Sequence, residues 1–231
     1  MNKPLLLILL LCAFTACSSV EIHITELPEG KVALKSIESG LFNEKAKAVV
    51  TFSPKQGGQI ENILWQGEKL LYKNAVEQFP NKETDFQKVK AQLTNDGESL
   101  IVTNRQRGLY QLRRSYSMKY NEELNEYCAE VIYTVKNYSS KNQLSYQWLQ
   151  LLSLNEKLLP GEKSGQWQFI ASDGAKVRFN IEFSGIEKLH SNSSTEQFGT
   201  LLTTSTQKNE TLKPKQRLSW KVLYRLQELE N

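Results

Sequence analysis

The chain has 231 residues, of which 39% are hydrophobic and 10% aromatic, and its formal net charge is +4. This apolar content is enough for one packed core, and the interspersed basic and acidic residues exclude the basic footprint of a nucleic-acid-binding protein. After the first residues, no apolar stretch approaches the roughly 20 residues that span a bilayer, which excludes a transmembrane helix there.

Residues 1–16 have the pattern of an export signal. Lys3 supplies a positive charge, and an unbroken apolar run over 5–11 is too short to span a bilayer. The Ala16-Cys17 junction resembles a bacterial lipobox, which implies that Cys17 becomes the lipidated first residue of the mature protein. The alternative is an ordinary cleaved signal in which Cys17 has no role.

The residue after the lipidated cysteine is Ser18. In the lipoproteins of Gram-negative bacteria that this pattern resembles, a residue other than aspartate there implies the outer membrane. We therefore expect an envelope lipoprotein on the periplasmic face of that membrane, held by acyl chains, such as palmitate, on Cys17. Residues 17–30 are polar and predict a tether that lifts the domain off the membrane. Residues 31–231 have the length of one β-sandwich domain.

The rest of the chain is predicted to be all-β. Asn95-Asp96-Gly97 and Ser172-Asp173-Gly174 are tight-turn signals between strand-like runs, and no 3.6-residue periodicity is sustained. Segments 74–85 and 185–199 are polar and predict loops. Strands are expected over 31–42, 44–53, 60–65, 68–72, 86–93, 99–104, 109–120, 126–137, 144–154, 165–171, 175–183, 201–206 and 217–227.

Little in the sequence points to metal or cofactor chemistry. The one cysteine outside the amino-terminal region, Cys128, lies in a strand pattern and is interpreted as a small buried residue rather than a nucleophile. The chain has no Cys/His zinc pattern, phosphate-binding glycine loop or dinucleotide fingerprint. The sequence therefore predicts no metal site and no cofactor.

Three stretches resemble the galactose mutarotase-like superfamily. Gly57-Gly58 precedes an apolar strand and a Gln66-Gly67 turn, Asn137 ends a long strand before a polar turn, and Leu212-Lys213-Pro214 introduces the final strand. The resemblance implies an antiparallel β-supersandwich with a sugar-facing sheet. It also implies a catalytic histidine on a central strand, where this chain has Gln147-Trp148-Leu149-Gln150 instead.

Two sets of residues are the remaining candidates for catalysis. Aldose ring opening needs a general acid and a general base. His190 with Glu196, or Tyr116 with Arg114, would have to converge in one cleft to supply them. Nothing in the spacing forces the side chains of His190 and Glu196 to meet.

The sequence favours carbohydrate binding over catalysis. Aromatic rings stack on sugar C–H faces and polar side chains bond to hydroxyls, so Trp148, Gln150 and Trp167 are ligand-binding candidates. Arg113 is a further candidate, for charge recognition, because a guanidinium pairs with the carboxylate of an acidic sugar. Each tryptophan has the alternative role of a core residue. Two other functions stay open: an epimerase or lyase of the same superfamily, and an envelope protein whose sheet binds a polypeptide partner.

Overall fold

A computed structural model describes residues 19–39, 44–54, 58–79, 89–94, 97–106, 108–185, 189–206 and 210–229. Within these residues every strand pairing is antiparallel, and a 3-10 turn, Pro28–Gly30, separates the first two strands. In this part of the chain, no helix is long and apolar enough to cross a membrane.

The largest sheet has eight strands. Its central strands are long and consecutive along the chain, with Tyr110–Asn121 pairing with Glu126–Asn137 over their full length. In spatial order the strands are β13 (Leu159–Pro160), β14 (Gln166–Ile170), β15 (Lys176–Ser184), β19 (Arg217–Leu229), β10 (Glu126–Asn137), β9 (Tyr110–Asn121), β8 (Leu100–Gln106) and β7 (Val89–Leu93).

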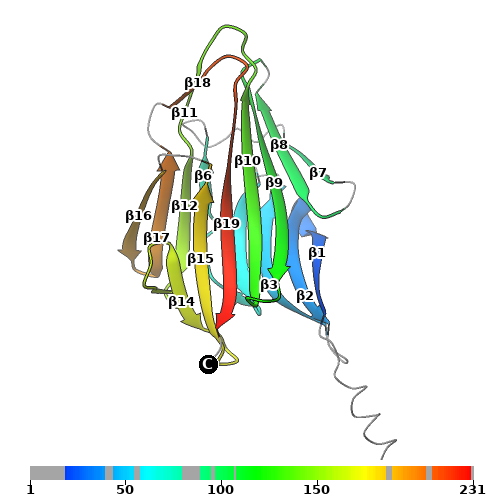
Figure 1. Ribbon diagram of the computed structural model, residues 1–231, viewed down its shortest axis with the longest axis vertical. Helices are drawn as coiled ribbons and strands as arrows, with labels where there is room; N and C mark the ends of the chain where they lie inside the picture. The colour runs from blue at the N-terminus through cyan, green and yellow to red at the C-terminus, as the bar shows by residue number, and fades with distance from the viewer. Residues whose placement is uncertain are drawn as a thin grey trace, which may run out of the picture.

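Two smaller sheets lie behind the large one (Figure 1). The five-stranded sheet consists of β1 (Ser19–Leu27), β2 (Lys31–Ser39), β3 (Glu44–Ser53), β4 (Gln59–Trp65) and β5 (Glu68–Lys69). The four-stranded sheet has the order β16 (Leu189–Glu196), β17 (Gly199–Thr206), β12 (Leu149–Asn155) and β6 (Val76–Gln78). A further pair, β11 (Leu144–Tyr146) and β18 (Glu210–Leu212), stands apart from these sheets.

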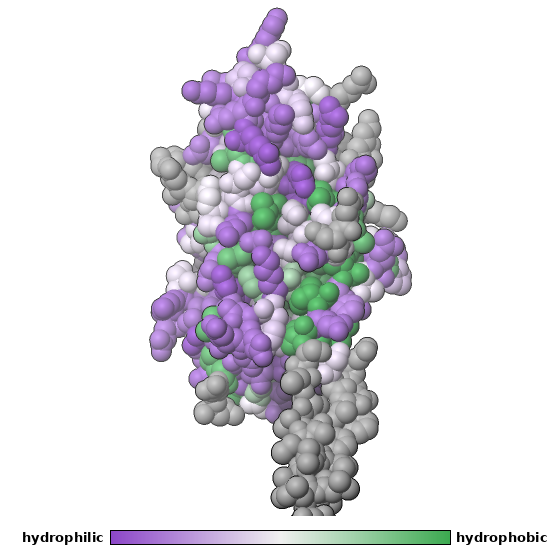
Figure 2. Space-filling model, turned by 45° about the vertical axis from the view of Figure 1, so that its right-hand side comes forward, coloured by the Kyte–Doolittle hydropathy of each residue, from purple (hydrophilic) through white to green (hydrophobic). Residues whose placement is uncertain are grey.

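One core fills the space between the layers because strand residues alternate between inward and outward faces. On β9, Leu112, Tyr116 and Met118 are buried, while Arg113 and Lys119, which point the other way, are exposed. Aromatic residues occupy the centre, where the rings of Tyr133 and Trp220 stack with centroids 5.0 Å apart. Figure 2 shows the face that β1 contributes to, where apolar side chains also reach the surface.

The expected tether is a strand, so that prediction was wrong. Residues 19–27 form β1, which pairs with β2 in unbroken register from Ser19 to Leu27. Val20, Ile22 and Ile24 alternate with polar residues and pack against the core. Three apolar residues at a spacing of two are enough for a half-buried edge strand, and the polar residues Glu21 and His23 between them hid this pattern.

Other strand boundaries were partly right. The expected strand 144–154 is two strands in different sheets, and the expected loop 185–199 contains the edge strand β16. The expected loop 74–85 contains β6, and its residues after 79 lie outside the described part, as do 86–88 and Gly57. Of the expected strand 68–72 only Glu68–Lys69 forms a strand, β5, and residues 40–42 of the expected strand 31–42 lie outside the described part. The remaining predicted strands are present with small shifts at their ends.

Candidate functional site

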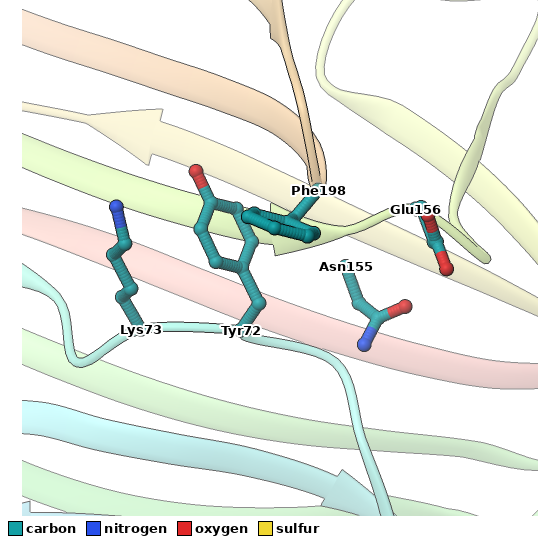
Figure 3. A pocket seen from close by; sticks show the side chains of 5 residues that line it. All are labelled: Tyr72, Lys73, Asn155, Glu156 and Phe198. Carbon is teal, nitrogen blue, oxygen red and sulfur yellow. The ribbon is translucent and has the colours of Figure 1, made fainter.

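A surface cavity of about 390 Å³ lies beside the turn that joins β16 to β17. Five side chains from three segments line it: Tyr72, Lys73, Asn155, Glu156 and Phe198 (Figure 3). The first two follow β5, Asn155 ends β12, Glu156 comes directly after it, and Phe198 lies in the turn. The cavity therefore forms only when segments from distant parts of the chain meet.

Backbone bonds fix the first two segments against each other. Leu71 forms an isolated bridge with Leu154, and both side chains are buried. The N–H of Tyr72 donates to the Ser153 carbonyl at 3.0 Å, and the N–H of Asn155 donates to the Leu70 carbonyl at 2.9 Å. The Tyr72 ring thus projects from a segment anchored in the core.

Gly199 allows the third segment to approach. Its φ is +138°, and a Cβ on this residue would lie 1.9 Å from the carbonyl oxygen of Leu154. Only glycine fits so close to a neighbouring backbone. The β16–β17 turn can therefore lie against the end of β12, which brings Phe198 to the cavity with 56% of its surface exposed.

The cavity combines aromatic faces with polar groups. The rings of Tyr72 and Phe198 have centroids 6.4 Å apart and are inclined by 56°. The ammonium of Lys73 lies 5.1 Å from the centroid of the Tyr72 ring. Figure 3 shows Asn155 and Glu156 on the other side of Phe198 from Lys73. A ligand here would meet an exposed aromatic surface bordered by an amide, a carboxylate and an ammonium.

The hydroxyl of Tyr72 donates a hydrogen bond to the carboxylate of Glu196, the last residue of β16. This bond, together with partial desolvation, raises the pKa of Tyr72 above its usual value of 10.0. Tyr72 is therefore a neutral hydrogen-bond donor at neutral pH and a poor general base.

Of the residues predicted for catalysis, Glu196 alone contacts this cavity's lining. His190 is exposed on the same strand but six residues earlier, about 20 Å away along an extended chain. The structure therefore does not bring His190 and Glu196 together in one cleft.

Arg114 and Tyr116 both point into the core. Arg114 is fully buried and donates from Nε to Oε1 of Glu77 at 3.0 Å and from Nη1 to Oδ1 of Asn104 at 2.7 Å. Tyr133 donates to the other Glu77 oxygen at 2.9 Å, and Tyr116 donates to the Gly58 carbonyl. These contacts connect β6 of the four-stranded sheet to β8, β9 and β10 of the large sheet. They form a structural link between layers rather than a solvent-filled cleft.

Burial controls the ionisation of this link. Desolvation alone would lower the pKa of Arg114, but the carboxylate of Glu77 holds it above its usual value. Desolvation raises the pKa of Tyr116 and of Tyr133, and the Glu77 charge adds to that shift. The arginine therefore stays charged and both tyrosines stay neutral across the physiological pH range.

Two of the predicted sugar-binding residues are buried in the core, which corrects that interpretation. Trp148 has no exposed surface and packs edge-on against Tyr133 and Trp220, with centroids 5.4 and 5.8 Å away. Gln150 is also buried, and its side-chain oxygen accepts a bond from Tyr224 at 3.1 Å. Gln150 faces inward on β12, and Trp148, two residues earlier and just before that strand, also points into the core.

Trp167 and Arg113 lie elsewhere. Trp167 is 4% exposed and lines a separate groove of about 270 Å³ between β14 and the β16–β17 hairpin, whose walls include Ser191, Ser193 and Thr195. Arg113 is exposed on the outer face of β9. In the described part of the chain, no group of three His, Cys, Asp or Glu side chains is placed to hold a metal ion.

Sequence reasoning missed the five residues that line the cavity. The available signal was Phe198, a single aromatic residue in a run of serine, threonine and other polar residues. An isolated aromatic in a polar segment has no core to join and is a candidate contact residue. Tyr72, Lys73, Asn155 and Glu156 gave no such signal, because their meeting depends on the long-range bridge between Leu71 and Leu154.

No family model matches this sequence, and no curated protein matches it as a relative. Solved structures do match the fold. A heparan sulfate lyase mutant from Pedobacter heparinus aligns with a TM-score of 0.55 and 9% identity, over 90% of this chain and 37% of the lyase. A proposed aldose 1-epimerase from Klebsiella pneumoniae aligns with a TM-score of 0.52 and 9% identity, over 94% of this chain and 85% of that one.

The chain thus spans little more than a third of the lyase. Identities this low establish the fold alone. The galactose mutarotase-like antiparallel β-supersandwich predicted from the sequence is confirmed.

Proposed function

We propose that this protein binds carbohydrate in the cavity beside Phe198 and is held in the cell envelope by acyl chains on Cys17. The observation that carries the binding proposal is the exposed Phe198 ring, set at an angle to Tyr72 and bordered by Asn155, Glu156 and Lys73. The similarity in fold to a heparan sulfate lyase and to a proposed aldose 1-epimerase is consistent with a sugar ligand.

The cavity's chemistry matches a sugar ring. The C–H face of a pyranose packs on an aromatic ring, and its hydroxyls exchange hydrogen bonds with amide, carboxylate and ammonium groups. A volume of about 390 Å³ is at the small end of ligand pockets, which is suitable for one or two sugar units.

The charges around the cavity favour particular sugars. Lys73 supplies one positive charge, whereas Glu156 and Glu196 supply two negative charges. Like charges at close range disfavour binding, so sulfated and uronic sugars are at a disadvantage. The ligand is therefore a neutral or amino sugar, unlike the heparan sulfate named for the lyase.

One observation favours a second candidate function. Tyr72 is a neutral proton donor in contact with the Glu196 carboxylate, and aldose epimerisation needs an acid and a base across one sugar ring. A sugar entering between the two groups would place Tyr72 as the acid and Glu196 as the base. Catalysis of mutarotation that is lost in Glu196→Gln would support this function, and an unchanged rate with bound sugar would exclude it.

The binding proposal is tested by calorimetric titration of the mature protein with neutral, amino and acidic oligosaccharides. Phe198→Ala should weaken binding of a neutral or amino sugar roughly tenfold or more, because about 1.4 kcal/mol of stacking is lost. Leu159→Ala is the matched control, since Leu159 is 65% exposed on β13 and lies outside the cavity. Equal affinity in the two variants, or binding of acidic sugars alone, would overturn the proposal.

A further inference from the structure

The start of β1 limits how far the domain can stand from a membrane. β1 begins at Ser19, only two residues after Cys17. Two extended residues span about 7 Å. A lipid attached to Cys17 would therefore hold one end of the sandwich directly at the bilayer, with no spacer between them.

Side-chain contacts identify which part of the large sheet lies at the same end of the domain as the start of β1. Val20 pairs with Glu38, whose carboxylate accepts a hydrogen bond from the Tyr127 hydroxyl at 2.5 Å. Tyr127 pairs with Tyr120, close to the turn between β9 and β10. The tip of the β9–β10 hairpin therefore lies at the same end of the molecule as the start of β1.

A second hairpin tip reaches the same end. The side-chain amide of Gln227 donates to the Leu124 carbonyl at 3.0 Å, which places the end of β19 at the β9–β10 tip. Leu229, two residues on, pairs with Lys176, and Lys176 pairs with Ile170 across the β14–β15 turn. Figure 1 shows both tips at the lower end, where β1 begins.

Each tip carries an exposed aliphatic side chain. Leu124 is 50% exposed in the β9–β10 turn, and Ile170 is 72% exposed at the end of β14. The opposite end of β9 offers a natural comparison, because Leu109 is 45% exposed immediately before that strand. Leu124 and Leu109 are thus similar in type and exposure and stand about 40 Å apart.

We propose that the end of the sandwich formed by Ser19, Leu124 and Ile170 docks on the lipid bilayer, with both aliphatic side chains in its interfacial layer. The inference rests on the proposed acylation of Cys17. Glu122 and Glu123 precede Leu124, and their acidic side chains are not attracted to anionic lipid headgroups. The proposed contact is therefore apolar and does not depend on anionic lipid.

This orientation keeps the sugar cavity in the half of the domain next to the membrane. Ser172, in the β14–β15 turn, donates its N–H to Glu68 at 2.5 Å, and Glu68 accepts a bond from Lys157 at 2.9 Å. Lys157 directly follows Glu156, which lines the cavity. The sugar that reaches Phe198 is then one displayed close to the bilayer surface.

The test uses the full acylated protein in vesicles of phosphatidylcholine and phosphatidylethanolamine. Cys128→Ser removes the half-buried thiol, and Leu124→Cys or Leu109→Cys then supplies one site for a fluorophore. With a quencher attached to the lipid headgroups, we expect the label at 124 to be quenched several-fold more strongly than the label at 109. Equal quenching at the two sites, or stronger quenching at 109, would overturn the docking.

Two further measurements separate this inference from the function it rests on. The intact mass of the mature protein reports acylation, and a mass without acyl chains would overturn both the anchoring and the docking. A failure to bind any oligosaccharide would overturn the sugar site and leave the quenching result unaffected.

A change of lipid tests the apolar character of the contact. Adding phosphatidylglycerol to the vesicles should leave the difference in quenching between positions 124 and 109 unchanged. Docking that required this anionic lipid would contradict an apolar contact.

Discussion

The hydroxyl of Tyr72 donates a hydrogen bond to the carboxylate of Glu196, which lies 124 positions later in the chain. Because the carboxylate opposes formation of a phenolate, Glu196→Gln should lower the pKa of Tyr72 toward 10.0. The difference between ultraviolet pH titrations with and without Tyr72→Phe isolates this tyrosine. Glu156 lines the same cavity but has no hydrogen bond to Tyr72, so Glu156→Gln should shift the pKa of Tyr72 less. An equal shift in both variants would contradict the assignment.

Loss of the Arg114 guanidinium should strongly lower the free energy of unfolding. Arg114→Met leaves the buried Glu77 carboxylate without its cation, which costs about 3–5 kcal/mol of unfolding free energy. Arg113→Met is the matched control, because its side chain is exposed, and should stay within about 0.5 kcal/mol of wild type. Urea unfolding of both variants makes the comparison.

A double-mutant cycle tests the interaction between Arg114 and Glu77 that connects the two layers. Arg114→Met combined with Glu77→Gln removes both charges, so it should be less destabilising than the sum of the two single changes. Additive losses would show that the two side chains act independently in the core.

Gly199→Ala should destabilise the protein by at least about 2 kcal/mol, because its Cβ would overlap the Leu154 carbonyl. Gly97→Ala provides the control, since Gly97 also has a positive φ but has no atom within 4 Å of the added Cβ, and should cost about 1 kcal/mol. Thermal unfolding compares them. The Gly199 variant should also bind sugar more weakly, since the turn that carries Phe198 must move. Equal stability in the two variants would contradict the close packing of Gly199 against the Leu154 carbonyl.

Cys128 should react slowly with iodoacetamide. Burial raises the pKa of its thiol to about 11, so at pH 8 only about one molecule in a thousand carries the reactive thiolate. The alkylation rate should rise with pH up to about 11 and should increase many-fold when the protein is unfolded in urea at pH 8. Rapid alkylation of the folded protein at pH 8 would show a more open or more electropositive site.

The fold was more predictable than the site. Period-two patterns and Asp-Gly turns depend on neighbouring residues, which is why β10 was predicted with its exact bounds and β9 within one residue. The same local signal failed for β16, where serine, threonine and asparagine form a strand through backbone pairing with β17. Its eight residues carry no apolar alternation that a sequence pattern could detect.

The site was hard to predict because it depends on long-range pairing. Trp148 and Gln150 have the residue types of a sugar platform, but both side chains are buried in the core. Glu196 was named for a partnership with His190, and its actual neighbour is Tyr72. Only the sheet order places the end of β12 beside the β16–β17 turn, and residue types alone do not specify that order.

All four tryptophans are at most 4% exposed: Trp65, Trp148, Trp167 and Trp220. The ultraviolet emission of the protein therefore originates in its interior, where Tyr133, Trp148 and Trp220 are in contact. A sugar that settles on Phe198 would leave this emission nearly unchanged, whereas melting would shift it to longer wavelengths. Intrinsic tryptophan fluorescence therefore reports unfolding without interference from ligand in the cavity. The stability of the variants can be compared in this way without an attached dye.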